Sequence, residues 1–164
     1  MKKSMKILFA IIVALALVTA VTSCKKSEAS NDKEEKDQFV TAMATDIGGL
    51  GDQSFNDGSY AGLQKAAEEL DNVKAIVVES NQQTDYIPNL TGLAEDGAGV
   101  VFAVGFLMAD ALVEVAAQFP DTAFAGIDIF IDPASAPKNA LGIQFKEQES
   151  GYLAGVVAGM LTKE

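Results

Sequence analysis

The sequence predicts an α/β fold in which a mostly parallel sheet is covered by helices on both faces. Three observations support this: short, wholly apolar segments recur from Phe39 onward, amphipathic segments alternate with them, and turn residues separate the two kinds. Strands that are apolar throughout are typical of a sheet that is buried on both faces. Alternation of strands and helices predicts βαβ units with right-handed crossovers.

The apolar runs place strands at residues 39–45, 73–79, 100–104, 123–127 and 141–145. Amphipathic spacing places helices at 58–70, 86–95, 108–119 and 147–161, so that strands and helices take turns along the chain. The last helix carries glycine at every fourth residue, at Gly151, Gly155 and Gly159. This spacing fits pairing of helices in a membrane, but the uncharged stretch 150–162 is too short to span one. Close packing of a helix on a sheet is the favoured interpretation.

The N-terminus has the layout of an export signal. Three lysines within residues 1–6 precede an apolar run at 7–21, which is shorter than the roughly 20 residues that a spanning helix needs. Thr22 and Ser23 then lead directly to Cys24, the only cysteine of the chain. This predicts a lipoprotein signal peptide at 1–23 and an acylated first mature residue, Cys24. The alternatives are an ordinary signal followed by a chance cysteine, or an uncleaved anchor.

Residues 25–38 combine charges of both signs with a single small apolar residue, which predicts a flexible tether. The formal charge of −11 becomes −14 when the three lysines of 1–23 are removed, so nucleic acid is not an expected partner. The chain has no histidine, and no nucleophile has a base beside it, so we expect no enzyme and no cofactor or metal. Paired carboxylates with glycosidic activity are the remaining catalytic alternative.

A ligand site is expected where the strands end, because open parallel sheets bind ligands beyond the carboxyl ends of their strands. The loop after the first strand, 46–57, is rich in glycine and holds Asp46, Asp52 and Asp57. It has neither the G-x-G-x-x-G pattern nor the Gly-Lys-Ser/Thr of phosphate-binding loops. Its acidity therefore favours a neutral or hydroxyl-rich ligand over a nucleotide.

Aromatic and amide side chains in these loops suit a planar ligand. Phe55 and Phe106 can offer flat apolar faces to a ring, and Asn56 can both donate and accept hydrogen bonds at the edge of a purine. The structural alternatives are Phe55 as a plug at the start of the following helix, and Asn56 or Asp57 as its N-cap.

Three carboxylates at the predicted strand ends, Asp46, Asp110 and Asp128, can accept hydrogen bonds from ring N–H groups or sugar hydroxyls. For Asp128 the alternative is that it caps a turn.

The chain resembles the basic membrane lipoprotein (BMP) family of ABC transporter substrate-binding proteins, which includes a purine nucleoside receptor. The matching segments, in family order, are TDIGGLGDQSFNDGSYAGL, DYIPNL, VGFLMADAL, FAGID and GIQFKEQESGYLAGVVAGMLTK. The resemblance implies a type I periplasmic-binding-protein-like fold of two Rossmann-like lobes. It implies a first lobe at 39–141 and a crossover with the second lobe's first helix at 142–164, the chain being truncated before most of that lobe.

By motif position, the resemblance implies a cleft lined by Asp46, Phe55, Asn56, Phe106 and Asp110, with Asp57 in addition, and a purine ring stacked on phenylalanine. It implies an ABC permease and ATPase as partners, and attachment by lipid to the outer face of the cell membrane.

The alternative function is a surface lipoprotein that interacts with host or matrix partners, or one that binds another small molecule. Because binding proteins close two lobes around their ligand, we expect the present chain alone to bind weakly or not at all.

Overall fold

The computed structural model describes residues 38–162, so the predicted signal peptide, Cys24 and the tether up to residue 37 lie outside the described residues. The strands are β1 (Phe39–Ala44), β2 (Val73–Val78), β3 (Val100–Val104), β4 (Ala123–Ile127) and β5 (Ala140–Ile143). The helices are α3 (Phe55–Glu69), α4 (Tyr86–Glu95), α5 (Ala109–Gln118) and α6 (Glu147–Leu161), and short 3₁₀ turns occupy Gln83–Asp85 and Phe106–Met108.

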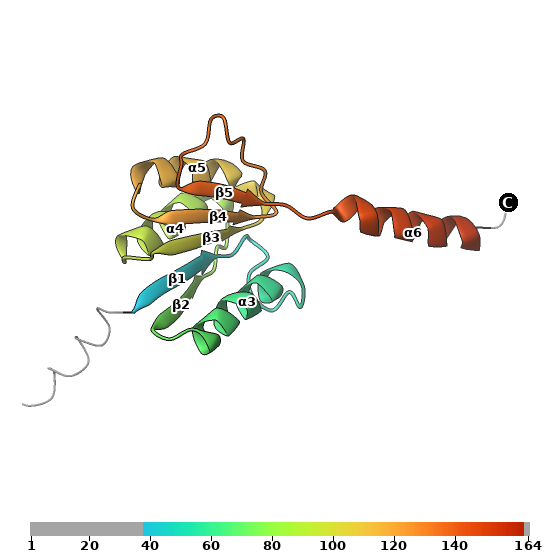
Figure 1. Cartoon of the computed structure of the whole chain (residues 1–164). Helices are drawn as coiled ribbons and strands as arrows, with labels where there is room; N and C mark the ends of the chain where they lie inside the picture. The colour runs from blue at the N-terminus through green and yellow to red at the C-terminus, as the bar shows by residue number, and fades with distance from the viewer. Residues whose placement is uncertain (1–37, 163–164) are drawn as a thin grey trace, which may run out of the picture. The chain divides into compact units, whose positions relative to one another are not determined.

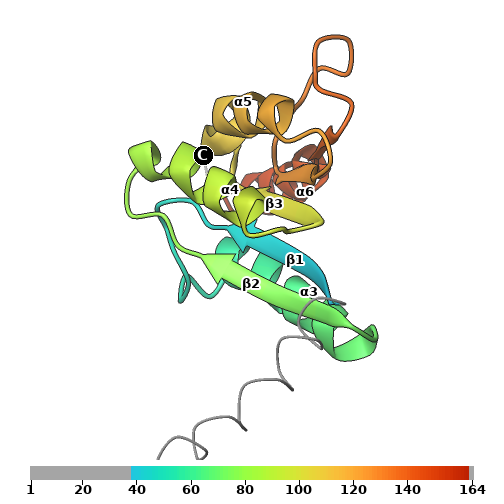
Figure 2. The same ribbon diagram turned by 90° about the vertical axis from the view of Figure 1, so that its left-hand side faces the viewer.

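All five strands are parallel and lie in the order β2-β1-β3-β4-β5 (Figure 1). Helix α3 covers one face of the sheet, and α4 and α5 lie on the other, as Figure 2 shows. The chain passes from β1 to β2 on one side and then returns to place β3 on the other side of β1. The order therefore reverses between β1 and β3, which is where open α/β sheets bind their ligands.

The apolar core is divided unequally between the two faces. The larger cluster fills the space between the sheet and the α4–α5 layer, with Leu90, Leu112 and Phe124 fully or almost fully buried. The cluster under α3 is smaller and centres on Met43, Leu63 and Val104. A single helix thus covers the second face, which leaves part of that face open.

The predicted elements agree closely with the observed ones at 86–95, 100–104, 123–127 and 147–161. Helix α3 begins at Phe55, three residues before the predicted start, because the Asp52 carboxylate accepts the N–H groups of Asn56 and Asp57 and so completes a turn inside the glycine-rich segment. The last strand is Ala140–Ile143, displaced toward the N-terminus from the predicted 141–145.

Strict alternation of strand and helix is wrong between β4 and β5, which residues 128–139 connect without a helix. Fully buried Ile129 takes the place of a packed helix there, because it lies over Gly126 and Gly142 where a Cβ atom at either glycine would collide with it. The amide Nδ2 of Asn139 lies within 3.0 Å of the carbonyl oxygens of three residues at the end of α5, Ala116, Phe119 and Thr122, and holds the connection in place.

Helix α6 has no buried residue, although its sequence is largely apolar. Within residues 38–162, every helix falls short of the length or apolarity required to cross a membrane. Within the described part of the chain, α6 therefore packs on no other element, and the expected close packing of its glycines on a sheet is not found there.

Candidate ligand-binding site

The site begins where β1 ends, at Thr45 and Asp46. The carboxylate Oδ1 of Asp46 accepts hydrogen bonds from the backbone N–H of Gly48 at 2.8 Å and from Asn56 Nδ2 at 2.9 Å. Asn56 lies in the first turn of α3 and is 2% exposed. The strand end and the helix start are thus joined through one carboxylate–amide pair, whose position is fixed on both sides.

Ser54 is the N-cap residue of α3, and the side chain that accepts the N–H groups at the helix start is that of Asp52, two residues earlier. The Asp52 carboxylate accepts the backbone N–H groups of Ser54, Asn56 and Asp57 at 3.0, 2.8 and 3.1 Å. These hydrogen bonds lower the pKa of Asp52 to about 2, and the backbone N–H of Asn56 makes the largest contribution. The N-cap interpretation of Asn56 and Asp57 is therefore wrong, since both lie inside the helix.

Two further carboxylates hold the glycine-rich loop itself. Asp57 accepts the N–H groups of Gly51 at 2.7 Å and Gln53 at 2.9 Å, one on each carboxylate oxygen. Glu79, just after β2, accepts the N–H of Leu50 at 2.7 Å and ties the loop to the neighbouring strand. The carboxylates of Asp57 and Glu79 thus accept the backbone N–H groups of this loop.

The neighbouring strand end approaches Asp46 closely at Gly105. This residue has φ = +105°, and a Cβ atom there would lie 3.2 Å from Asp46 Oδ2. Glycine is required for that backbone conformation, and it keeps the Oδ2 side of Asp46 free of a side chain. Phe106 follows directly and is 68% exposed, so an accessible aromatic residue comes one position after the backbone that approaches Asp46.

Asp110 lies in the first turn of α5 and is exposed, on the same edge of the sheet as Phe106. Asp128 follows β4 with φ = +58°, is partly buried, and donates its N–H to the carbonyl of Ile143 at 2.8 Å. Both residues stand at the carboxyl ends of strands, as predicted, with Asp128 one strand further from β1 than Phe106.

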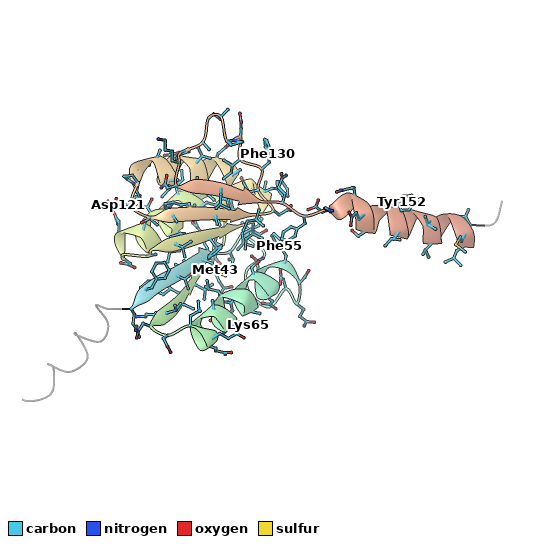
Figure 3. The ribbon with its side chains drawn as sticks, viewed as in Figure 1. Met43, Phe55, Lys65, Asp121, Phe130 and Tyr152 are labelled. Atoms are coloured by element: carbon cyan, nitrogen blue, oxygen red, sulfur yellow. The ribbon has the colours of Figure 1, made fainter. Side chains whose placement is uncertain are left out.

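Phe55 has a different environment from Phe106. Its ring, labelled in Figure 3, is partly buried against the cluster of Met43, Leu63 and Val104 under α3. It therefore contributes to packing of the helix start, as the structural alternative expected, and its availability to a ligand stays a prediction.

Tyr86, the first residue of α4, is 2% exposed and was not among the predicted site residues. Burial raises the pKa of its phenol, the backbone of Ile47 opposes that rise in part, and the charge of Asp46 adds to it. Among the described residues, Asn56 Oδ1 is buried without a hydrogen-bond partner, and the buried Tyr86 hydroxyl lies near the Ile47 backbone without forming a hydrogen bond of good geometry. Both atoms belong to residues near Asp46, so the buried polar atoms that lack a full hydrogen bond are gathered around that carboxylate.

Among the described residues, no group of three or more acidic, histidine or cysteine side chains could hold a metal ion. At this edge Asp46 and Asn56 offer hydrogen-bonding groups, and the exposed Phe106 offers an aromatic ring.

Comparison with known proteins places this geometry in context. Residues 39–164 match the Bmp family, described as "ABC transporter substrate-binding protein PnrA-like". The chain is 33% identical over 168 residues to the "CD4+ T-cell-stimulating antigen" of Listeria innocua, covering 99% of this chain and 46% of that protein. It is also 33% identical over 156 residues to the "ABC transporter nucleoside-binding protein BmpA" of Lactococcus lactis, covering 92% of this chain and 43% of that protein.

A solved structure of an ABC transporter solute-binding protein from Aeropyrum pernix superposes with a TM-score of 0.65 at 30% identity, covering 73% of this chain and 32% of that one. The chain thus spans less than half the length of these relatives, and the matched part corresponds to a parallel α/β lobe. Since the family match extends from β1 to the end of the chain, this protein belongs to the Bmp family of ABC transporter substrate-binding proteins.

Proposed function

We propose that this chain is the ligand-capturing part of a lipid-anchored, extracytoplasmic substrate-binding protein that delivers purine nucleosides to an ABC importer. The observation that carries the proposal is the fixed Asp46–Asn56 pair at the point where the strand order reverses, with the exposed Phe106 directly after Gly105, whose backbone approaches Asp46. Membership of the Bmp family and the nucleoside-binding name of the Lactococcus relative support it.

Each polar group has a defined role in this proposal. Asn56 and the Gly48 amide hold Asp46 through Oδ1, and glycine at position 105 leaves Oδ2 uncovered on that side. A carboxylate oxygen so placed accepts hydrogen bonds from the hydroxyls of a ribose or from a ring N–H. Phe106 stacks on the purine, and Asp110 and Asp128 add acceptors at the rim.

The remaining parts of the proposal concern regions beyond the described lobe. Cys24 carries the lipid and residues 25–38 form the tether that holds the domain outside the membrane. Residues 142–164 begin a second lobe, and closure of two lobes around the nucleoside presents the complex to a permease with its ATPase.

The test is isothermal titration of inosine, guanosine and adenosine into a version of the protein extended to the length of its relatives. We expect saturable binding, and much weaker binding by the 164-residue chain, because one lobe supplies only part of the contacts. Stacking of a base on an aromatic ring contributes about 1–3 kcal/mol, so Phe106→Ala should weaken binding by about 5- to 150-fold.

The chain offers a matched control in Phe130, which is also 68% exposed but follows β4 rather than β3. Phe130→Ala should leave the affinity unchanged. Equal losses in the two variants, or no nucleoside binding by a folded extended protein, would contradict the proposal.

A further inference from the structure

Tyr86 is a buried phenol whose hydroxyl group has no hydrogen-bond partner in the described part of the chain. It is the first residue of α4, is 2% exposed, and belongs to the apolar core between the sheet and the α4–α5 layer. Because the side chain is already covered within this lobe, neither solvent nor a second lobe supplies the missing partner.

A hydroxyl in this position is unfavourable for the fold alone. A buried polar group that makes no hydrogen bond destabilises the folded protein, and such groups are uncommon in native structures. Phenylalanine at position 86 would fill the same space without that cost. We therefore expect the hydroxyl to gain a partner in another state of the lobe.

The groups closest to the hydroxyl belong to the end of the first strand. Burial is the largest cause of the raised pKa of Tyr86, and the backbone of Ile47 and the charge of Asp46 are the other two. Both groups therefore lie close to the phenol. The Ile47 amide and the Tyr86 hydroxyl do not form a hydrogen bond of good geometry, so a small shift of the amide is enough to complete one.

Contacts other than the hydroxyl fix the start of α4. Asn89, one turn after Tyr86, donates through Nδ2 to Ser80 Oγ at 3.0 Å. The N–H of Ser80 donates to Thr45 Oγ1 at 3.3 Å, and the Thr45 hydroxyl donates to the carbonyl oxygen of Asp46 at 3.0 Å. The phenol is therefore held at the end of β1 whether or not its hydroxyl forms a hydrogen bond.

The backbone at Ile47 is less constrained by packing than the start of α4. Ile47 is 51% exposed, and two glycines, Gly48 and Gly49, follow it. Glycine gives a backbone access to more conformations than other residues have. A change that brings the two groups together is thus a movement of the Ile47 amide toward the phenol, directly beside the carboxylate that the proposed ligand contacts.

We propose that Tyr86 is a positioning residue of the ligand site, whose hydroxyl accepts the Ile47 N–H when a ligand forms hydrogen bonds with Asp46. A hydrogen bond that forms only in the ligand-bound state favours that state and so raises the affinity. Tyr86 then holds Asp46 from the α4 side, as Asn56 holds it from the α3 side. This inference rests on the proposed function and adds a residue that acts without touching the ligand.

Titration of guanosine into the extended protein and its Tyr86→Phe variant tests the inference. The substitution keeps the ring and removes only the hydroxyl. We expect guanosine to bind about 2- to 13-fold more weakly, the ratio that corresponds to one intramolecular hydrogen bond. The control is Tyr60→Phe, which removes the hydroxyl of a partly buried tyrosine on α3 and should leave the affinity unchanged.

The melting temperature without ligand separates positioning from a purely structural role. Tyr86→Phe should leave it unchanged or raise it, because the lost hydroxyl has no partner. Thr45→Val is the matched contrast, because the Thr45 hydroxyl is equally buried but has partners, and it should lower the melting temperature by about 2–6 °C. A fall of similar size in Tyr86→Phe would show that its hydroxyl serves the fold and would overturn the inference.

The amide proton of Ile47 gives a direct spectroscopic signature. On saturation with guanosine its resonance should move downfield in the unchanged extended protein, and by less in Tyr86→Phe. Equal affinities and equal Ile47 shifts in the two proteins would overturn the inference and leave the proposed function standing. Absence of guanosine binding by the folded, unchanged extended protein would overturn both.

Discussion

Replacement of Gly105 by alanine tests the link between the end of β3 and Asp46. The backbone on both sides of Gly105 is held, since its N–H donates to the Ile127 carbonyl and its carbonyl accepts the N–H of Met108, each at 2.9 Å. Relaxation of φ = +105° is therefore restricted, and a side chain in this region costs about 1–3 kcal/mol. The new Cβ would also press on Asp46 at 3.2–3.3 Å, so we expect a total loss of about 2–4 kcal/mol in the free energy of unfolding.

Urea denaturation followed by circular dichroism measures this loss. With a slope of about 2 kcal/mol per molar urea, the middle of the usual range, the midpoint should fall by about 1–2 M. Gly97→Ala is the matched control, because Gly97 has φ = +86° but a Cβ there would contact nothing within 4 Å. Gly97→Ala should therefore lose only the about 1–3 kcal/mol that a side chain costs in this backbone conformation.

Nuclear magnetic resonance adds a local readout, since the Gly48 amide donates to Asp46 Oδ1. Its resonance should shift in Gly105→Ala and stay in place in Gly97→Ala. If Gly105→Ala were no less stable than Gly97→Ala, and the Gly48 resonance did not move, the proposed packing of Gly105 on Asp46 would be refuted.

Three further predictions concern the scaffold of the site. Leu112→Ala, which empties a fully buried position, should lower the free energy of unfolding by about 2–5 kcal/mol. Lys65→Ala, on the exposed surface, should change it by less than about 0.5 kcal/mol. Thermal denaturation of the two variants measures the difference. Gly142→Ala should destabilise strongly because its Cβ would collide with the Ile129 carbonyl, and an unchanged melting temperature would contradict that contact. The pKa of Asp52 is lowered from 3.8 to about 2 in the folded protein. Its stabilising contribution is therefore present above pH 4 and is lost as the pH falls toward 2. Between pH 4 and 2, the free energy of unfolding of Asp52→Asn should change less with pH than that of the unchanged protein.

The parallel sheet and most of its elements were predictable because apolar, β-branched segments such as 100–104 are bounded by turn residues on both sides. The start of α3 was not, because the capping carboxylate, Asp52, stands before two further loop residues and reaches across them. The connection from β4 to β5 was also missed, since packing of Ile129 over two glycines depends on contacts between segments and leaves no periodic pattern.

The sequence predicted that Asp46, Asn56 and Phe106 lie at the carboxyl edge of the sheet, and the structure has them there, because the carboxyl ends of parallel strands meet at one edge. It could not show which loop carboxylates face a ligand. Asp57 serves the loop amides, and Tyr86 lies buried beside Asp46 although an aromatic residue at a helix start gives no signal of that position.

The most direct test of the central claim is a map of backbone amide shifts when guanosine is titrated into the protein extended to the length of its relatives. The proposed site predicts that the largest shifts within this lobe fall in residues 46–56 and 105–110, and that they disappear in Phe106→Ala while persisting in Phe130→Ala. Saturable shifts confined to the sheet face beside α3, around Met43 and Phe102, would contradict a site at the point where the strand order reverses between β1 and β3.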